Sequence, residues 1–203
     1  MKTLAKTVFA IALTAVVFTS SAMAATVTTP ETTVSAANTL PAFNRIWVSG
    51  NVKLVLTQGS TNTVAGDEHF DPAITYLKSD GKTLFINSTA SNQVTLKISM
   101  KDLERIEAYG QSVVVTSSNF DVKNLQLFLN QSATAKINTT AKSLYTVVQE
   151  DAVLKLNGSA QHSTLVAANM KNVKMNDFAS QRSASYTSEE IMKAEETAMV
   201  LAK

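Results

Sequence analysis

Four stretches of the chain align into a repeated pattern, and this repeat constrains the fold more than any other feature of the sequence. Each stretch ends in an apolar residue, and these residues are separated by steps of 22, 19 and 19 positions: Val115, Ile137, Leu156 and Met175. A second set of apolar residues lies two positions earlier: Val113, Ala135, Leu154 and Val173. Lysine stands between the two sets in the last three stretches. Apolar residues that alternate with a charged residue are typical of a β-strand with one buried face.

The recurrence of this strand pattern about every 20 residues is typical of a solenoid, in which equivalent segments stack on one another. Segments before the repeat also alternate between apolar and polar residues, as at Val52, Leu54 and Leu56. Such alternation predicts further β-strands, and helix signals are almost absent before residue 187. We therefore expect an all-β, right-handed parallel β-helix or solenoid with coils of about 19–22 residues.

Residues 1–24 have the composition of a secretory signal peptide. Lys2 and Lys6 precede an apolar run, 8–18, and a small-residue cleavage site ends at Ala24. The apolar run is too short to span a membrane, and no later run approaches the length of a spanning helix. We therefore predict cleavage after Ala24, export to the periplasm or to the cell exterior and surface, and no membrane span in the mature chain.

The mature chain is expected to be formally neutral, because loss of Lys2 and Lys6 from 18 basic residues leaves 16, against 16 acidic residues. A nucleic-acid partner normally requires a basic face, so we predict none. Zero cysteines predict that no disulfide bond stabilises the fold. The pattern divides the mature chain into a flexible Thr/Ala-rich leader, 25–41, a β-solenoid domain, 42–188, and a C-terminal helical tail, 189–203.

The tail begins with a capping box formed by Thr187 and Glu190, and residues rich in helix formers follow. The residues that lie on one face at helical spacing are Ile191, Ala194, Ala198 and Leu201. A helix here would cover the open end of the solenoid, which is otherwise an exposed edge. A helix that binds a partner is the alternative.

Two polar sets accompany the repeat. The lysine row consists of Lys136, Lys155 and Lys174, and the asparagine row consists of Asn138, Asn157 and Asn176. Stacked strands place equivalent residues about 4.8 Å apart. The lysine row is a candidate anion- or glycan-binding ladder for an acidic polysaccharide; alternatively it is a solvated face relieved by acids such as Glu150, Asp151 and Asp177. The asparagine row is interpreted as structural, because stacked amides can bond to one another.

Candidates for catalysis and metal binding are few. Asp67, Glu68, His69 and Asp71 are close enough in sequence to bind Ca²⁺ or to act as an acid–base pair, but a polar turn has the same composition. The two histidines, His69 and His162, stand in no metal-ligand pattern. No motif of a serine, cysteine or zinc hydrolase and no phosphate-binding loop is present. We therefore predict no catalytic residue, no metal site and no cofactor.

Three segments, 43–60, 80–86 and 94–115, resemble the auto-transporter adhesin head GIN domain family, and the resemblance extends from Pro41 to Ser188. The family shows an opening strand pair, a Gly-X-Leu-X-Ile segment and repeats that carry a Ser-Gly-Ser-Gly turn. The resemblance implies a secreted bacterial protein of right-handed parallel β-helix type. At the four turn positions of this chain only Gly110 keeps the glycine, so we expect turn geometry that differs in detail.

These observations favour a secreted, non-catalytic envelope or surface protein, an adhesin-like binding module for a glycan or protein ligand. One alternative is a polysaccharide-active β-helix enzyme, a lyase or hydrolase, which would require clustered acids on one face. Glu150 and Asp151 are adjacent, so on a strand they would point to opposite faces. The other alternative is a purely structural envelope protein.

Overall fold

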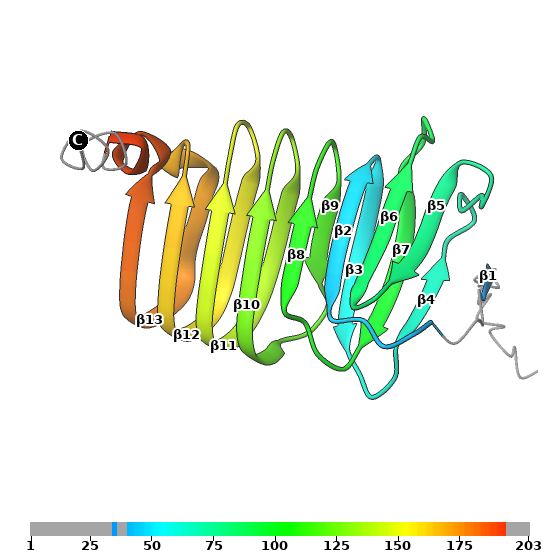
Figure 1. The fold of residues 1–203 in the computed structure, drawn as a ribbon, viewed down its shortest axis with the longest axis horizontal. Helices are drawn as coiled ribbons and strands as arrows, with labels where there is room; N and C mark the ends of the chain where they lie inside the picture. The colour runs from blue at the N-terminus through cyan, green and yellow to red at the C-terminus, as the bar shows by residue number, and fades with distance from the viewer. Residues whose placement is uncertain (1–33, 36–39, 194–203) are drawn as a thin grey trace, which may run out of the picture. The chain divides into compact units, whose positions relative to one another are not determined.

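The computed structural model of the protein describes residues 34–35 and 40–193, which lie within one compact unit, Glu31–Lys203. The predicted signal peptide and most of the predicted leader lie outside these residues. Thirteen strands join in one sheet, and a short 3-10 helix, η1, precedes the last strand (Figure 1). The elements are β1 (Val34–Ser35), β2 (Arg45–Gly50), β3 (Val52–Gln58), β4 (Thr63–Gly66), β5 (Thr75–Asp80), β6 (Thr83–Ser88), β7 (Val94–Met100), β8 (Arg105–Ala108), β9 (Val113–Thr116), β10 (Phe120–Leu129), β11 (Thr134–Val148), β12 (Val153–Ala167), η1 (Met170–Asn172) and β13 (Val173–Thr187).

The order of the strands in space differs from their order in the chain. Along the sheet the order is β1-β4-β7-β3-β9-β11-β10-β8-β2-β6-β5, and β12 and then β13 pair beyond β11. Most neighbours are parallel, whereas β1 pairs antiparallel with β4, β4 with β7, and β5 with β6. Because β2 lies between β6 and β8, and β3 between β7 and β9, these early strands are enclosed by strands that follow them in the chain.

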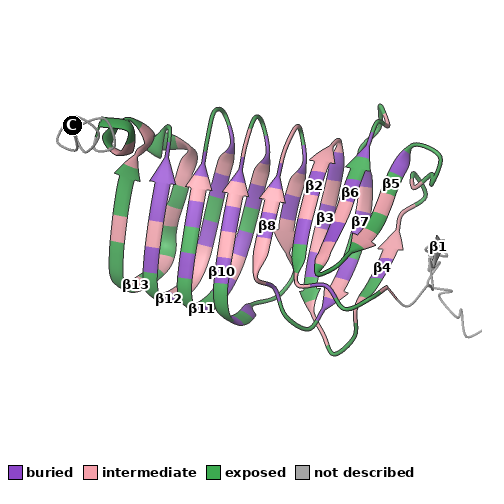
Figure 2. Ribbon diagram, viewed as in Figure 1, coloured by how far each residue is buried: buried purple, intermediate pink, exposed green. Residues whose placement is uncertain are grey.

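The sheet curls because its longest strands bend. β11 pairs with β9 through residues 134–136 and with β10 through residues 139–148, so one strand joins both walls of the curl. The first wall contains β4, β7, β3 and β9, and the second contains β5, β6, β2, β8 and β10. β12 and β13 follow β11 through the same bend. Alternate residues of both walls point inward and form the buried core, which Figure 2 shows as purple bands.

The expectation of an all-β chain is confirmed, but the expectation of a right-handed parallel β-helix solenoid is wrong. The strands form a mixed, curled sheet, a half-barrel with both parallel and antiparallel pairs. A solenoid requires each segment to stack on the segment before it. Here the chain leaves β3, forms the antiparallel strands β4 and β5, and returns as β6 and β7 on the far side of β2 and β3.

The register inferred from the repeat holds for part of the chain. Ile137 pairs with Leu156, as predicted, but Val115 pairs with Lys136 instead of Ile137. The first stretch ends in three consecutive valines, which give no period to distinguish inward from outward residues. The structure buries Val114 and turns Val115 outward, so the first stretch lies one residue out of the predicted register.

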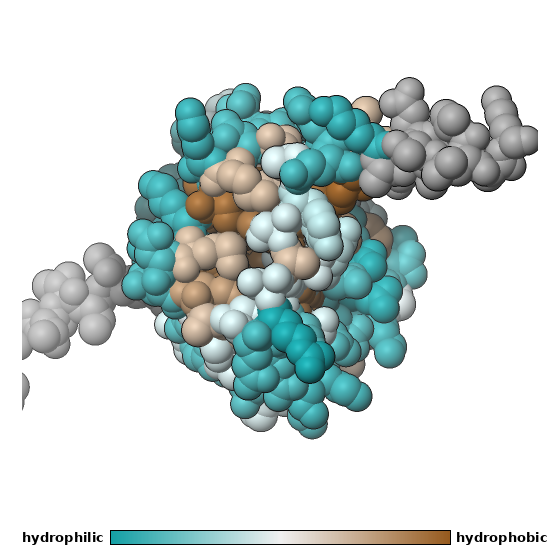
Figure 3. Space-filling model, turned by 90° about the vertical axis from the view of Figure 1, so that its left-hand side faces the viewer, coloured by the Kyte–Doolittle hydropathy of each residue, from teal (hydrophilic) through white to brown (hydrophobic). Residues whose placement is uncertain are grey.

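The last strand leaves one edge of the sheet without a neighbouring strand among the described residues, because β13 pairs with β12 alone. Val173, Met175 and Phe178 pack against the core from this strand and are only partly buried. Figure 3 views this end of the sheet and shows apolar side chains gathered at its centre, within a polar rim. The end of the curl is therefore more apolar than its outer surface.

A helix begins at residue 188, directly after β13, and is described as far as residue 193. The predicted capping box is confirmed: the Thr187 backbone N–H donates to Glu190 Oε2 at 2.7 Å, and the Glu190 N–H donates to Thr187 Oγ1 at 3.3 Å. These bonds satisfy amides that the helix leaves without internal partners. The rest of the predicted tail, 194–203, lies outside the described residues.

Three turns share one backbone geometry, in which the second residue has a positive φ. The angle is 67° at Gly110, 58° at Gln131 and 54° at Glu150. A backbone bond from the fourth to the first residue closes each turn, as from Ala152 N to Gln149 O at 3.1 Å. The left-handed conformation costs a residue with a Cβ about 1–2 kcal/mol. Glu150 therefore carries backbone strain that Gly110 does not.

Replacing Glu150 with glycine is expected to stabilise the protein. Glycine adopts the left-handed conformation freely, and part of this gain is offset by its greater freedom in the unfolded chain. We expect the free energy of unfolding to rise by about 0.5–1 kcal/mol, measured by urea denaturation. Asp151→Gly is the control, because Asp151 is not among the residues with positive φ; an equal gain there would contradict the explanation.

Candidate functional site

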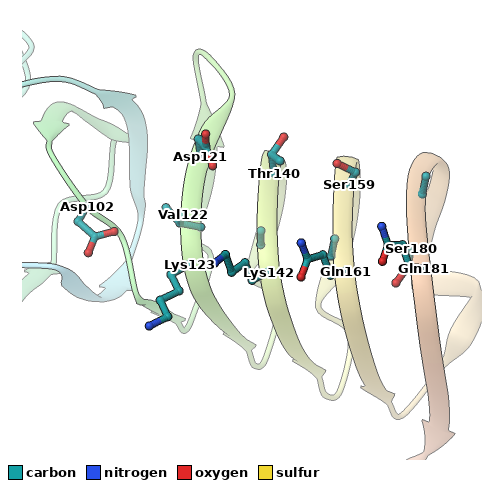
Figure 4. Close-up of a pocket in the computed structure, with 13 residues that line it drawn as sticks. Asp102, Asp121, Val122, Lys123, Thr140, Lys142, Ser159, Gln161, Ser180 and Gln181 are labelled. Atoms are coloured by element: carbon teal, nitrogen blue, oxygen red, sulfur yellow. The ribbon is translucent and has the colours of Figure 1, made fainter.

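A groove of about 820 Å³ crosses the outer surface where β10, β11, β12 and β13 bend (Figure 4). Four three-residue segments form most of its lining, one from each strand: 121–123, 140–142, 159–161 and 179–181. Its volume lies within the range of ligand pockets in proteins, which is about 300–1,000 Å³. The groove is open along its length, so it fits an extended ligand that crosses the strands.

The pairing of the strands aligns equivalent residues of these segments. Val122 pairs with Ala141, Ala141 with Ala160, and Ala160 with Ser180. The middle residues Val122, Ala141 and Ala160 are buried and belong to the core, whereas the residues on either side of each are exposed or partly exposed. These flanking residues therefore line the groove, and the middle residues hold each strand against the core at the bend.

The third residues of the segments form a polar row along the groove: Lys123, Lys142, Gln161 and Gln181. All four are exposed, and Figure 4 shows them projecting from successive strands. Parallel strands repeat about every 4.8 Å, so the row offers hydrogen-bond donors at that spacing. Ammonium groups at one end and amides at the other can bind hydroxyl, carboxylate or sulfate oxygens.

The end of the groove at β10 is fixed by a side chain of the first wall. Gln58 Nε2 donates to the backbone carbonyls of Asp121 at 3.0 Å and Lys101 at 3.2 Å, and the Asp121 N–H donates to Gln58 Oε1 at 2.9 Å. Asp102, next to Lys101, lines the groove at this end. The amide of Gln58 thus ties β10 to the loop after β7, and the two lysines of the groove lie at this same end.

The lysine row lies on the outer surface near the groove. Lys155 pairs with Lys136 on one side and with Lys174 on the other, and all three side chains are exposed. Along β11, Lys136 lies four positions before Thr140 of the groove lining, a distance of about 13 Å at the usual strand rise. Lysines on neighbouring strands repel one another by about 0.9 kcal/mol in water. No carboxylate among the described residues forms an ion pair with any of the three.

The asparagine row lies between the lysine row and the groove. Asn138 pairs with Asn157, but Asn157 pairs with Asp177, because the register of β12 and β13 shifts by one residue after Lys155. Asn176 is therefore not the partner of Asn157. The buried Oδ1 of Asn157 has no hydrogen-bond partner among the described residues. The backbone N–H of Asn138 donates to Thr116 Oγ1 at 2.8 Å, which ties β11 to the end of β9.

The acidic cluster after β4 forms a turn. Asp67 Oδ2 accepts from the Thr95 N–H at 2.9 Å and Oδ1 accepts from the His69 N–H at 3.1 Å, while Asp71 Oδ1 accepts from the Ala73 N–H at 2.8 Å. These bonds use the carboxylates to close the backbone turn and to hold it against β7. Within 34–35 and 40–193, no group of three or more acidic, histidine or cysteine side chains is placed to hold a metal ion.

The groove is not among the sites predicted from the sequence, although the segments that line it follow a repeated pattern in the sequence. The segments Asp-Val-Lys, Thr-Ala-Lys, Ser-Ala-Gln and Ala-Ser-Gln begin at positions 121, 140, 159 and 179, so they recur at nearly constant steps. Each has a small or compact residue at its centre and a long polar residue after it. The four aligned stretches end at the apolar positions of the repeat, before the bend, and therefore leave these segments out.

Comparison with known proteins supplies a family and a fold. The family model described as "Putative auto-transporter adhesin, head GIN domain" matches residues 42–188. Two similar solved structures are called putative adhesins: one from Bacteroides fragilis has 17% identity, a TM-score of 0.67 and 73% coverage of each chain, and one from Parabacteroides distasonis has 14% identity, a TM-score of 0.55 and coverage of 73% and 75%. A structure from Parabacteroides distasonis called a putative lipid binding protein has 12% identity, a TM-score of 0.51 and the same coverage.

Searches of curated proteins find no match. Among the residues that the structure describes, no helix has the length and apolar character that crossing a membrane requires. The similar structures therefore show which proteins share this fold. A proposal for function must rest on the surface residues of this chain.

Proposed function

Because the chain belongs to the auto-transporter adhesin head GIN domain family, we propose that it is an exported, non-catalytic binding module that holds an extended acidic polysaccharide. The ligand would lie in the groove across β10–β13, beside the lysine row. The single observation that carries this proposal is the groove itself, with a polar side chain repeated on each of four neighbouring strands.

The charges around the groove favour an acidic ligand. Lys123 and Lys142 lie on one side of it and the three residues of the lysine row on the other, against Asp102 and Asp121 in its lining. The mutual repulsion within the lysine row is not relieved by an ion pair with a described residue. An anionic polymer that crosses the strands would relieve it along the whole row.

The repeated spacing favours a polymer over a small molecule. The groove presents similar donors on successive strands about 4.8 Å apart, so contacts with one unit of a chain can be made again with the next. Such multiple weak contacts add up to useful affinity when they are linked in one ligand. This is the behaviour expected of an adhesin-like module that recognises a surface glycan.

The chemistry of the groove supports a non-catalytic role. Its two carboxylates, Asp102 and Asp121, are both exposed to water, and Asp102 Oδ1 accepts from the Leu103 N–H at 2.9 Å. Glycoside hydrolysis uses a carboxyl group that its surroundings shield from water, paired with a second carboxylate across the sugar. The polysaccharide-active enzyme remains the alternative, and a structural envelope protein is the second.

The other parts of the chain have supporting roles in this proposal. The role proposed for the predicted signal peptide, 1–24, is to direct export. The role proposed for the predicted tail, 189–203, is to cover the end of the sheet, where β13 leaves partly buried apolar side chains such as Phe178. A covered edge keeps the module from pairing with other sheets.

Affinity electrophoresis of the purified protein through gels that contain polygalacturonate, alginate or neutral dextran tests the proposal. We expect retardation by the two acidic polymers and none by dextran. Replacing Lys136, Lys155 and Lys174 together with glutamine is expected to weaken binding about tenfold, at roughly 0.5 kcal/mol for each lysine. Lys123→Gln with Lys142→Gln is expected to act in the same direction.

The matched control replaces Lys78, Lys82 and Lys171 with glutamine, which changes the net charge equally at exposed sites outside the groove and the lysine row. Equal loss of affinity in the control would show that overall charge, and not this site, attracts the polymer. Absence of retardation by both acidic polymers would refute the proposal. New chain ends in the polymer after incubation would make the enzyme the better explanation.

A further inference from the structure

Aromatic side chains gather on the outer surface of the second wall, away from the groove. The pairing of β6, β2, β8 and β10 places Phe85, Trp47, Glu107 and Phe128 in one row across the sheet. Buried residues alternate with these positions, as Ile46 and Val48 do on either side of Trp47, so the row faces outward. Three strand spacings of about 4.8 Å give the row a length of about 14 Å.

The rings form two clusters within this row. Trp47 lies 6.1 Å from Phe85 and 5.5 Å from Tyr109, measured between ring centroids, and Phe128 lies 6.0 Å from Tyr145. We call these five side chains the aromatic strip. Cross-strand packing stabilises such pairs of rings. The five rings lie on the outer surface of the sheet, however, and are not part of the inward-facing core. None of the five lines the groove.

Charged side chains between the clusters are paired with one another. Arg105 lies between Arg45 and Gln126 in the neighbouring row of residues, and its Cζ is 5.3 Å from the centroid of Phe128. Its Nη1 donates to Glu107 Oε1 at 3.2 Å and its Nε donates to Gln126 Oε1 at 2.8 Å. Arg45 forms an ion pair with Glu104 at 3.6 Å. The strip therefore presents hydrogen-bonding groups whose charges are balanced in pairs.

Tyr109 is part of the same arrangement. Burial, followed by the charge of Glu107 and a hydrogen bond to it, raises the pKa of Tyr109 above its ordinary value. The phenol is thus protonated at neutral pH and its O–H serves as a donor. Glu107 accepts from both Tyr109 and Arg105, which fixes its carboxylate between the two ring clusters.

We propose that the aromatic strip is a binding site for a neutral oligosaccharide, distinct from the groove. A pyranose ring has one face of C–H bonds and a rim of hydroxyl groups. The C–H face packs on an aromatic ring, and the rim requires donors and acceptors such as Gln126, Arg105 and Glu107. Internal pairing of the charges makes the site complementary to an uncharged ligand, whereas the groove and the lysine row are complementary to an acidic one.

The single tryptophan of the chain lies in the strip and reports binding directly. The purified protein is titrated with cellohexaose, xylohexaose and mannohexaose while the emission of Trp47 is recorded. We expect a saturable blue shift with at least one of them, because a stacked sugar removes water from the indole. Phe128→Ala is expected to raise the Kd about tenfold, since it removes one stacking surface and keeps the reporter.

Phe128→Leu serves as a second variant that keeps the apolar volume and removes the ring, and thermal melting checks that both variants fold. Tyr76→Ala is the control, because Tyr76 is 54% exposed and lies on β5, outside the strip. No change in Trp47 emission with any of the three sugars overturns the inference, as does unchanged affinity in Phe128→Leu. Glutamine substitution of the lysine row is expected to leave this titration unchanged, so failure here and failure of the acidic-polymer experiment are separate results.

Discussion

Replacing Gly158 with alanine is expected to destabilise the protein by about 3–5 kcal/mol. Gly158 lies in the bend of β12 with φ at +104°, a region that residues with a Cβ rarely adopt. An added Cβ would also collide with the backbone carbonyl oxygen of Thr139 on β11. Backbone cannot move aside as a flexible side chain can, so the strain and the collision add. We expect the melting temperature to fall by about 10 °C, measured by calorimetry.

Gly81→Ala separates the two contributions. Gly81 also has a positive φ, +55°, but an added Cβ would meet nothing within 4 Å. Only the conformational cost of about 1–2 kcal/mol is expected there. If the two substitutions lowered the melting temperature equally, the contact between Gly158 and Thr139 would not matter, and the close approach of β11 and β12 at the bend would be refuted.

The sequence contains enough information for the strands and for part of their register. The alternation in β11 and β12 predicts their inward and outward residues, and Ile137 does pair with Leu156. The three valines at 113–115 do not specify a register, because they lack the period that identifies the buried face. The shift after Lys155 that brings Asp177 opposite Asn157 is a local irregularity, and an alignment at constant spacing cannot contain it.

The order of the strands could not be predicted from the repeat. β2 pairs with β6 and β8, which come well after it in the chain, and no local pattern encodes which of two later strands will flank an earlier one. A solenoid is the simplest arrangement for a repeat. The chain does not form one, because it passes through the antiparallel strands β4 and β5 before it returns to the sheet as β6 and β7. The strands and the types of side chain on them could therefore be predicted from the sequence, whereas the way in which the sheet closes could not.

The two surface sites differ in how far the sequence reveals them. The groove could have been found, because its segments recur at nearly constant steps on consecutive strands. The aromatic strip could not, since Trp47, Phe85 and Phe128 follow no common spacing and meet only through the pairing of β2 with β6 and β8. Sites built across strands of distant sequence require the fold before they can be recognised.

Replacing Phe120 with alanine is expected to lower the free energy of unfolding by about 3–5 kcal/mol. Phe120 opens β10 at the bend and is fully buried, and it is the largest of the fully buried side chains in the described residues. Its carbonyl accepts from Thr139 Oγ1 at 2.8 Å, which joins β10 to β11 directly beside the groove. The cavity left by alanine would lie under residues 121–123, so polysaccharide binding is expected to weaken together with stability.

Phe120→Leu keeps most of the buried volume and is expected to cost less than about 1.5 kcal/mol. Urea denaturation measures both variants, and affinity electrophoresis below their unfolding transitions measures the groove. A stable Phe120→Leu protein with unchanged affinity for acidic polymers, beside a destabilised Phe120→Ala protein with reduced affinity, would link the packing of the bend to the shape of the groove. Full affinity in a folded Phe120→Ala protein would show instead that the strand pairing alone holds residues 121–123 in place.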